Sequence, residues 1–384
     1  MNINRLAIAL LLVLTLTAAA QDRPRLVVHE WGTFTSVSGS SGVALEWRPL
    51  AGPSDLPSFV YDATRPRPTT GPSDYDPRQR KKRMVCTVRM ETPVLYFYAD
   101  KETRVSVKVD FPKGKITEWY PAAREAGSTI DWGTISVLPG AAPELPTEKG
   151  ESHYYPARET DAAPVRVGTQ HEKFLFYRGA GTFDLPLKAG LDKGQVRVDN
   201  ATKHRWSRLF LVNVKNGRLA YTVREPGSHK ADEIWLTPIP SKESSVQALA
   251  ADVVKTLTEE GLYRREAEAM VKTWRDTWFA DEGMRVFYVV PRRITDELLP
   301  LTVSPAPTEC VRVLVGRAEI ITPEMEKGVL ADVERLGSDS FDEREDAMKS
   351  LRRIARFIEP ILKRALETAT DAEVKARLKT LLGG

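Results

Sequence analysis

The sequence lacks the short motifs that mark the common enzyme and nucleotide-binding families. It contains no G-x-S-x-G elbow, no Walker loop, no G-x-G-x-x-G turn, no H-E-x-x-H pair and no C-x-x-C. These absences remove the usual grounds for predicting a serine hydrolase, a nucleotide-binding protein, a zinc protease or a thioredoxin-type enzyme. The identity of any cofactor is left open, since no motif indicates one.

A strong excess of charge and long apolar runs are missing as well. The 384 residues include 56 basic and 52 acidic side chains, which gives a net charge of +4. Nucleic-acid binding needs a concentrated basic face, so it is not predicted. The one strongly basic run, 78–83, follows a Pro/Gly/Asp-rich stretch and predicts a solvated loop. No stretch after the N-terminus approaches the roughly eighteen apolar residues of a membrane helix, so no membrane span is predicted.

The N-terminal twenty residues have the pattern of a secretory leader. Arg5 provides a positive charge, residues 6–16 form an apolar segment, and Ala18, Ala19 and Ala20 fit a small-residue cleavage site. The apolar segment is too short for a comfortable membrane span. We therefore predict that residues 1–20 are a signal peptide and that the protein is secreted or periplasmic.

Cysteine is scarce. Cys86 and Cys310 are the two cysteines of the sequence. Export permits a disulfide between them, and it would close a loop worth about 4–5 kcal/mol in chain-entropy models. Two buried free thiols are the alternative.

Residues 21–241 are predicted to form a β-rich, sandwich-like domain. β-branched and aromatic residues recur in short runs, and Val105, Val107 and Val109 alternate cleanly with polar neighbours. Asn216-Gly217 between two such runs predicts a tight hairpin. The expected strands are 26–35, 84–90, 94–98, 105–111, 130–138, 173–177, 195–199, 209–215 and 218–223.

Two long Pro/Gly-rich segments interrupt the predicted strands, at 49–77 and 139–164. Loops of this length without regular structure are commonly functional lids or linkers. These two segments are therefore the first places in which a site is expected.

The rest of the chain is predicted to mix helices and strands and then to become helical. Residues 242–321 should form an α/β block packed on the β-rich domain, with helices at about 245–260 and 264–279 and strands at 285–290 and 310–315. Residues 322–384 should form amphipathic helices starting near 322, 340, 359 and 370. The fold class is therefore predicted to be α+β.

A metal site is one hypothesis for chemistry. His29, His171 and Glu172 are of the residue types that bind zinc and related ions, and they lie in the β-rich part. Neighbours in a strand point to opposite faces, so His29 and Glu30 can share one site only if the strand bulges. Ordinary hydrogen-bonded or surface histidines are the alternative.

A carboxylate pair is the second hypothesis. Glycoside cleavage needs two acids flanking the bond. Glu30 and Glu91 are the candidate catalytic residues, because Glu30 lies beside an aromatic side chain and Glu91 lies close to others. Glu118, next to Trp119, has a similar setting. Acidic residues beside aromatic ones are also common in sandwich cores, so the pattern alone does not decide.

Two segments carry a family resemblance. Residues 28–36 (VHEWGTFTS) and 90–98 (METPVLYFY) resemble an uncharacterised family of exported bacterial proteins with an HEWGTFTS-type opening motif, and Trp274-x-x-x-Trp278-Phe279 fits the same pattern. The resemblance covers most of residues 25–320. It implies export and architecture, and it supplies neither an activity nor catalytic residues. Residues 322–384 resemble a separate HEAT-like helical repeat, which needs another surface to cover its apolar face.

These patterns favour a non-enzymatic module over an enzyme. The leading prediction is an exported soluble protein that binds a ligand or a surface through its long loops, with carbohydrate or a cell-surface polymer as candidate ligands. Another protein is a candidate partner of the C-terminal helices. The alternative is a hydrolase of extracellular polymer, either metal-assisted or acting through a carboxylate pair.

Overall fold

The structure is a computed structural model, and it describes residues 25–50, 55–63, 84–200, 202, 204, 206–225 and 234–382, without the side chains of 355 and 356. The predicted leader at 1–20 and the whole basic run at 78–83 lie outside these residues. The mixture of sheets and helices confirms the predicted α+β class. Within the described ranges, no helix has both the length and the apolar character needed to cross a membrane.

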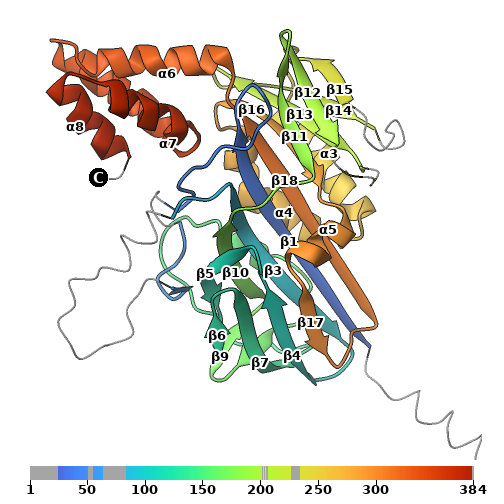
Figure 1. Cartoon of the computed structure of the whole chain (residues 1–384). Coiled ribbons are helices and arrows are strands. Elements are labelled where there is room, and N and C mark those ends of the chain that lie inside the picture. The colour runs from blue at the N-terminus through green and yellow to red at the C-terminus, as the bar shows by residue number, and fades with distance from the viewer. Residues whose placement is uncertain are drawn as a thin grey trace, which may run out of the picture.

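A nine-stranded sheet forms the centre of the molecule (Figure 1). In spatial order its strands are β14 (Arg218–Arg224), β13 (Leu209–Lys215), β16 (Gly283–Val289), β18 (Glu309–Ile320), β1 (Leu26–Ser38), β3 (Val88–Ala99), β10 (Leu175–Gly181), β5 (Gly114–Tyr120) and β2 (Tyr61–Asp62). β1 runs parallel to β18 and antiparallel to β3. All thirteen residues of β1 are buried, as expected of a strand that is covered on both faces.

The strands at 283–289 and 309–320 are part of this sheet, and they do not form a block packed on it. β16 pairs with β13, and β18 lies between β16 and β1. Both strands are buried over most of their length, as expected of strands inside a sheet that is covered on both faces. The chain therefore returns after about 280 residues to complete the sheet that it began with β1.

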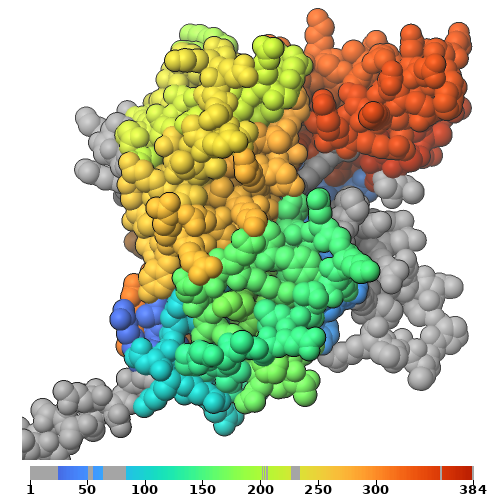
Figure 2. Space-filling model, turned by 180° about the vertical axis from the view of Figure 1, so that it is seen from behind, coloured from blue at the N-terminus to red at the C-terminus, as the bar shows by residue number. Residues whose placement is uncertain are grey.

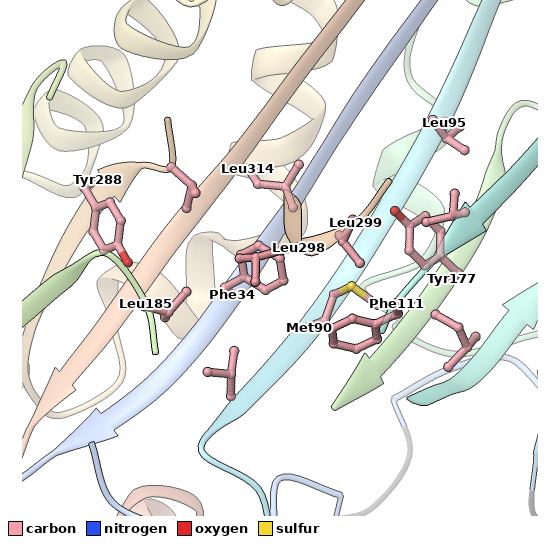
Figure 3. Close-up of a cluster of buried hydrophobic side chains, with 14 of the residues drawn as sticks. Phe34, Met90, Leu95, Phe111, Tyr177, Leu185, Tyr288, Leu298, Leu299 and Leu314 are labelled. Atoms are coloured by element: carbon pink, nitrogen blue, oxygen red, sulfur yellow. The ribbon is translucent and has the colours of Figure 1, made fainter. Parts of the chain in front are cut away.

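Two smaller sheets cover one face of the large sheet. The first contains β17 (Leu301–Ser304), β4 (Thr103–Asp110), β7 (Thr129–Val137), β8 (Val165–Val167) and β9 (Gln170–Glu172), with β6 (Glu125–Ala126) paired to β7. The second contains β11 (Leu187–Asp192), β12 (Gln195–Asn200) and β15 (Ile234–Pro238). Their apolar side chains share one core with the large sheet, in which Phe34, Met90, Tyr177 and Leu314 meet (Figure 3). This packing of sheet on sheet agrees with the predicted sandwich.

Helices cover the opposite face. α3 (Val246–Glu259) and α4 (Arg264–Phe279) pack with the short helix η1 (Tyr155–Arg158) over Trp31, Tyr96 and Phe176. Trp274 and Trp278 of α4 are buried in this second core. Ser245 caps α3 as predicted, and a further short helix, α5 (Arg292–Leu298), follows β16.

The predicted hairpin at Asn216-Gly217 is confirmed. β13 and β14 pair in register on either side of it. Asn216 has φ of 54° and Gly217 has φ of 73°. Two consecutive positive φ angles characterise the type I′ turn, whose twist matches that of the flanking strands.

Three helices close the chain: α6 (Pro323–Arg335), α7 (Phe341–Thr368) and α8 (Ala372–Leu381). The helix predicted to start near 359 is wrong, because α7 continues through Pro360. The apolar faces of the three helices pack on Val37, Trp47 and Ile321 of the main body. An ion pair of 2.6 Å between Arg48 Nε and Glu359 Oε1 adds to this contact. The HEAT-like character of the segment stays a prediction.

Candidate functional site

Glu30 lies in the interior between the sheets. Its carboxylate accepts hydrogen bonds from Arg312 Nε and from the Tyr177 hydroxyl, both at 2.5 Å. The side chains of Glu30 and Arg312 have no exposed surface. Burial, reinforced by the charge of Glu30, raises the pKa of Tyr177 well above its usual value. This carboxylate is thus paired with a guanidinium and shielded from solvent.

Glu91 faces the other side of the same sheet. Its neighbour Met90 belongs to the core between the sheets, and successive residues of a strand point to opposite faces. Glu91 accepts a hydrogen bond of 2.8 Å from the Thr35 hydroxyl and lies 3.4 Å from Arg89 Nε. The structure therefore does not bring Glu30 and Glu91 together as a catalytic pair. Acids that act on one glycosidic bond must converge on it.

His29 contacts α4. Its Nδ1 lies 2.7 Å from Glu266 Oε2, and both side chains are fully buried. Glu266 also accepts hydrogen bonds from the Tyr98 hydroxyl at 2.7 Å and from the Tyr263 backbone N–H at 2.8 Å. His29 and Glu30 face opposite sides of β1, because the bulge in this strand comes after them, between Trp31 and Thr33. The His29–Glu266 pair thus joins the first turn of α4 to the sheet.

His171 and Glu172 also diverge. Glu172 is fully buried, accepts two hydrogen bonds from Arg158 at 2.6 and 2.9 Å, and accepts a third from the Tyr154 hydroxyl. His171 is partly exposed on β9, opposite Arg166. In the part of the chain that the structure describes, no three His, Cys, Asp or Glu residues are placed to hold a metal ion. The predicted set of His29, His171 and Glu172 is therefore not assembled.

The two cysteines are free thiols. Cys310 pairs with Val28 near the start of β1, whereas Val88, just after Cys86, pairs with Ser36 near its end. Val28 and Ser36 lie eight residues apart on the same strand, which corresponds to about 26 Å. A disulfide requires Cα atoms within about 7 Å. The predicted disulfide is therefore wrong.

The two Pro/Gly-rich segments come together on the molecular surface, insofar as they are described. Ser152 Oγ donates to the Asp55 carbonyl at 2.6 Å, and Glu148 accepts a hydrogen bond of 2.9 Å from the Ser58 backbone N–H. Seen from behind, the green surface of the second segment adjoins the yellow and orange surface of α3 and α4 (Figure 2). Segments far apart in the sequence thus build one continuous surface.

A histidine that the sequence did not single out as a site residue joins these segments to α4. His153 Nδ1 lies 2.8 Å from Asp55 Oδ2, and its Nε2 lies 2.8 Å from Asp276 Oδ2. Burial opposes the charged form, but the hydrogen bonds to Asp276 and Asp55 outweigh it and raise the pKa of His153 to about 9. Both ring nitrogens are occupied, so this imidazolium is a structural link and offers no free base for catalysis.

Asp55 is itself fixed by a buried guanidinium. Arg178 donates to its two carboxylate oxygens at 2.6 and 3.0 Å, and the Thr92 hydroxyl accepts from the same arginine at 3.2 Å. Burial would raise the pKa of Asp55, but Arg178 holds it well below its usual range. Thr92 has a φ of 49°, uncommon for a β-branched residue. Asp55 therefore ties the 55–63 segment to the buried Arg178 and to His153.

The exposed end of this surface is aromatic. Tyr61 of β2 lies parallel to Trp119 of β5, with ring centres 6.0 Å apart and an angle of 13° between planes. Tyr61 is 37% exposed and Trp119 is partly exposed. The Gln170 amide donates to the Tyr61 hydroxyl at 2.9 Å, and its carbonyl accepts from the Ala122 backbone N–H at 2.7 Å. We call Tyr61, Trp119 and Gln170 the aromatic face.

A series of further aromatic rings connects the aromatic face to the protein interior. Tyr120 is stacked with Tyr61 at 6.3 Å and meets Phe59 edge to face at 5.0 Å. Phe59 in turn contacts the buried Tyr154 at 5.5 Å, and the Arg158 guanidinium lies 5.5 Å from the centre of the Tyr154 ring. Edge-to-face and offset contacts of this kind fix ring orientations. Trp119 beside Glu118 was visible in the sequence, but its pairing with Tyr61 was not.

Comparison with known proteins assigns no family. No family model matches the chain, and no curated protein matches it. Among solved structures, the Mu homology domain of Fcho1 from Danio rerio, determined with a bound Eps15 peptide, aligns over 79% of this chain and 100% of that chain, with 6% identity and a TM-score of 0.29. A likeness this weak identifies neither a fold family nor a function.

Proposed function

We propose that the protein is an exported binding module that recognises sugar rings of an extracellular or cell-surface polymer through the aromatic face. The observation that carries this proposal is the parallel, solvent-accessible pair of Tyr61 and Trp119. The apolar C–H face of a pyranose ring can stack on such rings, while polar atoms beside them bond to the hydroxyl groups. Tyr and Trp suit this task because each combines a flat apolar body with a polar tip.

Preorganisation supports the proposal. Gln170 holds the Tyr61 hydroxyl, and Tyr120 stacks with the same ring. Asp55, fixed by Arg178 and His153, anchors the segment from which Tyr61 extends. A ligand that meets side chains already in place does not have to order them, and this lowers the free-energy cost of binding.

The positions of the acidic residues favour binding over catalysis. Glu30, Glu91 and Glu172 lie within the protein, and each is paired with an arginine. A hydrolytic acid must reach the scissile bond and have a pKa suited to proton transfer. The leader pattern at 1–20 supports export, and an exported module would meet such polymers.

The test is affinity electrophoresis of the protein through gels that contain soluble β-glucan, peptidoglycan fragments or dextran. One of these polymers should retard the wild-type protein. Tyr61→Ala and Trp119→Ala should each weaken retardation by about 30-fold, since an aromatic hot spot contributes about 2 kcal/mol or more. Phe341→Ala is the matched control, because Phe341 is 63% exposed but belongs to α7.

Two outcomes would contradict the proposal. The first is that none of the polymers retards the wild-type protein. The second is that retardation persists unchanged in both aromatic variants while their thermal unfolding stays normal. Loss of retardation in Phe341→Ala alone would place the binding surface on the C-terminal helices instead.

A further inference from the structure

A cavity of about 710 Å³ lies beside the hairpin that β13 and β14 form. β14 is one edge strand of the nine-stranded sheet and β2 is the other, so the cavity and the aromatic face lie at opposite edges. Residues 239–243, which connect β15 to α3, form the second wall of the cavity. The volume lies within the range of ligand pockets, about 300–1,000 Å³.

Hydrogen bonds hold residues 239–243 against the hairpin. The Asn213 side-chain amide donates to the Pro240 carbonyl at 3.0 Å, and the Ser244 backbone N–H donates to the Leu219 carbonyl at 2.8 Å. Glu243 also forms an antiparallel bridge with Ala220. Both walls are therefore tied together, and a ligand would not have to order them.

The alternation of β13 determines which side chains face the cavity. Leu211 belongs to the core between the sheets, whereas Val212 and Val214 belong to the core under the helices. Lys215 therefore points to the same side as Leu211. Arg218 lies directly opposite Lys215 in the hairpin register and shares this side. Both cations line the cavity.

The positive charges of Lys215 and Arg218 are not compensated within the hairpin. Side chains directly opposite in an antiparallel pair have Cβ atoms about 4.5–5.5 Å apart, and like charges at such positions are destabilising. Neither cation forms an ion pair with a residue that the structure describes. The neighbouring Glu282 instead accepts the Asn216 backbone N–H at 2.7 Å. Negative groups of a ligand next to these two cations would relieve their repulsion.

Glu243 contributes the opposite charge to the same cavity. It is bridged to Ala220, and paired residues of antiparallel strands share a face, so its side chain lies on the side of Arg218. Among the described residues, Glu243 has no ion-pair partner either. Ile239 and Pro240 add apolar surface. The lining thus combines two cations, one carboxylate and an apolar part.

We infer that this cavity binds an acidic amino acid. Its two carboxylates would pair with Lys215 and Arg218, its ammonium group would pair with Glu243, and its methylene groups would contact Ile239 and Pro240. Two negative groups and one positive group are the complement of the charges that line the cavity. This site is independent of the aromatic face and of the function proposed for it.

The test is isothermal titration of the full-length protein with L-glutamate, up to about 10 mM ligand. L-glutamine lacks one carboxylate, and glutarate lacks the ammonium group. We expect glutamate to bind and each analogue to bind about tenfold more weakly, since each loses one charge-assisted contact.

Two variants assign the contacts. Glu243→Gln should weaken glutamate binding by about tenfold and leave glutarate binding unchanged, because glutarate has no ammonium group. Lys215→Gln should weaken the binding of both ligands. It should not lower the melting temperature, because it removes the repulsion of Arg218. Arg293→Gln is the control, since Arg293 is 75% exposed on α5, and it should leave binding unchanged.

The inference is overturned if glutamate does not bind, or if glutamate, glutamine and glutarate bind equally well. A Glu243→Gln variant that loses glutarate binding as strongly as glutamate binding would also overturn it, since Glu243 would then not contact the ammonium group. Polymer retardation in the electrophoresis experiment does not depend on this cavity, so the two proposals fail separately.

Discussion

Replacing Glu30 tests whether this buried acid is structural or catalytic. Glu30→Gln would leave Arg312 in the core with its charge uncompensated on one side, at a site where neither side chain is exposed. Breaking a buried ion pair in this way costs about 3–5 kcal/mol. Arg312 keeps a second partner, because its Nη1 lies 2.8 Å from Asp296 Oδ1. We therefore expect a loss of unfolding free energy at the lower end of this range, about 3 kcal/mol.

The size of the protein sets the expected change in melting temperature. An unfolding entropy of about 2.1 cal/mol/K per residue over about 360 residues gives about 0.75 kcal/mol/K, so 3 kcal/mol lowers the midpoint by about 4 °C. Circular dichroism during heating measures this shift. Glu297→Gln is the control, since Glu297 is 62% exposed in an i,i+4 pair with Arg293 and should shift the midpoint by less than about 1 °C.

A double-variant cycle makes the test specific to the pair. Arg312→Met alone should also destabilise the protein, because it leaves Glu30 buried without its cation. The combination with Glu30→Gln should be less destabilised than the two single changes predict when added, because side chains in contact do not act independently. A Glu30→Gln variant that melts with the wild type yet loses polymer binding or a hydrolytic activity would refute the structural role.

Three further predictions address the connections between segments. Because the pKa of His153 rises from 6.5 to about 9 on folding, its stabilisation should be complete below about pH 6.5 and lost as the pH rises through 9. The stability difference between wild type and His153→Gln in urea titrations should shrink over that window, and a constant difference would exclude the charged link. Trp47→Ala should cost about 3–5 kcal/mol in the core that joins the C-terminal helices to the body. Limited proteolysis should then release those helices, and an unaltered digestion pattern would contradict their docking through Trp47. Cys86 and Cys310 should both react with a thiol reagent in denaturant without reductant, and unreactive cysteines would reveal a disulfide.

Local structure was largely predictable from the sequence. Ser245, the apolar spacing and Gly261 defined α3, because caps and periodicity are encoded over a few residues. Asn216-Gly217 defined its hairpin for the same reason. Alternation in a strand also indicated correctly that His29 and Glu30 would face opposite sides of β1.

Long-range pairing was not predictable. Nothing local in residues 309–320 indicates that this strand runs parallel to β1. The sequence therefore predicts an α/β block packed on the β-rich domain instead of strands within the large sheet. The partners of the site residues are equally distant: His29 meets Glu266 from 237 positions away, and Asp55 meets His153 from 98 positions away. The sequence identifies residue types that can act in a site, such as histidine and the acids. Which of them become neighbours in space is determined by the topology of the fold.

The central claim is that Tyr61 and Trp119 form the surface that binds polymer, and radical footprinting tests it most directly. Hydroxyl radicals oxidise exposed aromatic side chains, and mass spectrometry reports the extent of oxidation at each residue. On addition of the polymer that retards the protein, oxidation of Tyr61 and Trp119 should fall while that of Phe341 stays constant. Protection of Phe341, or unchanged oxidation of both aromatic-face residues under saturating polymer, would contradict the account.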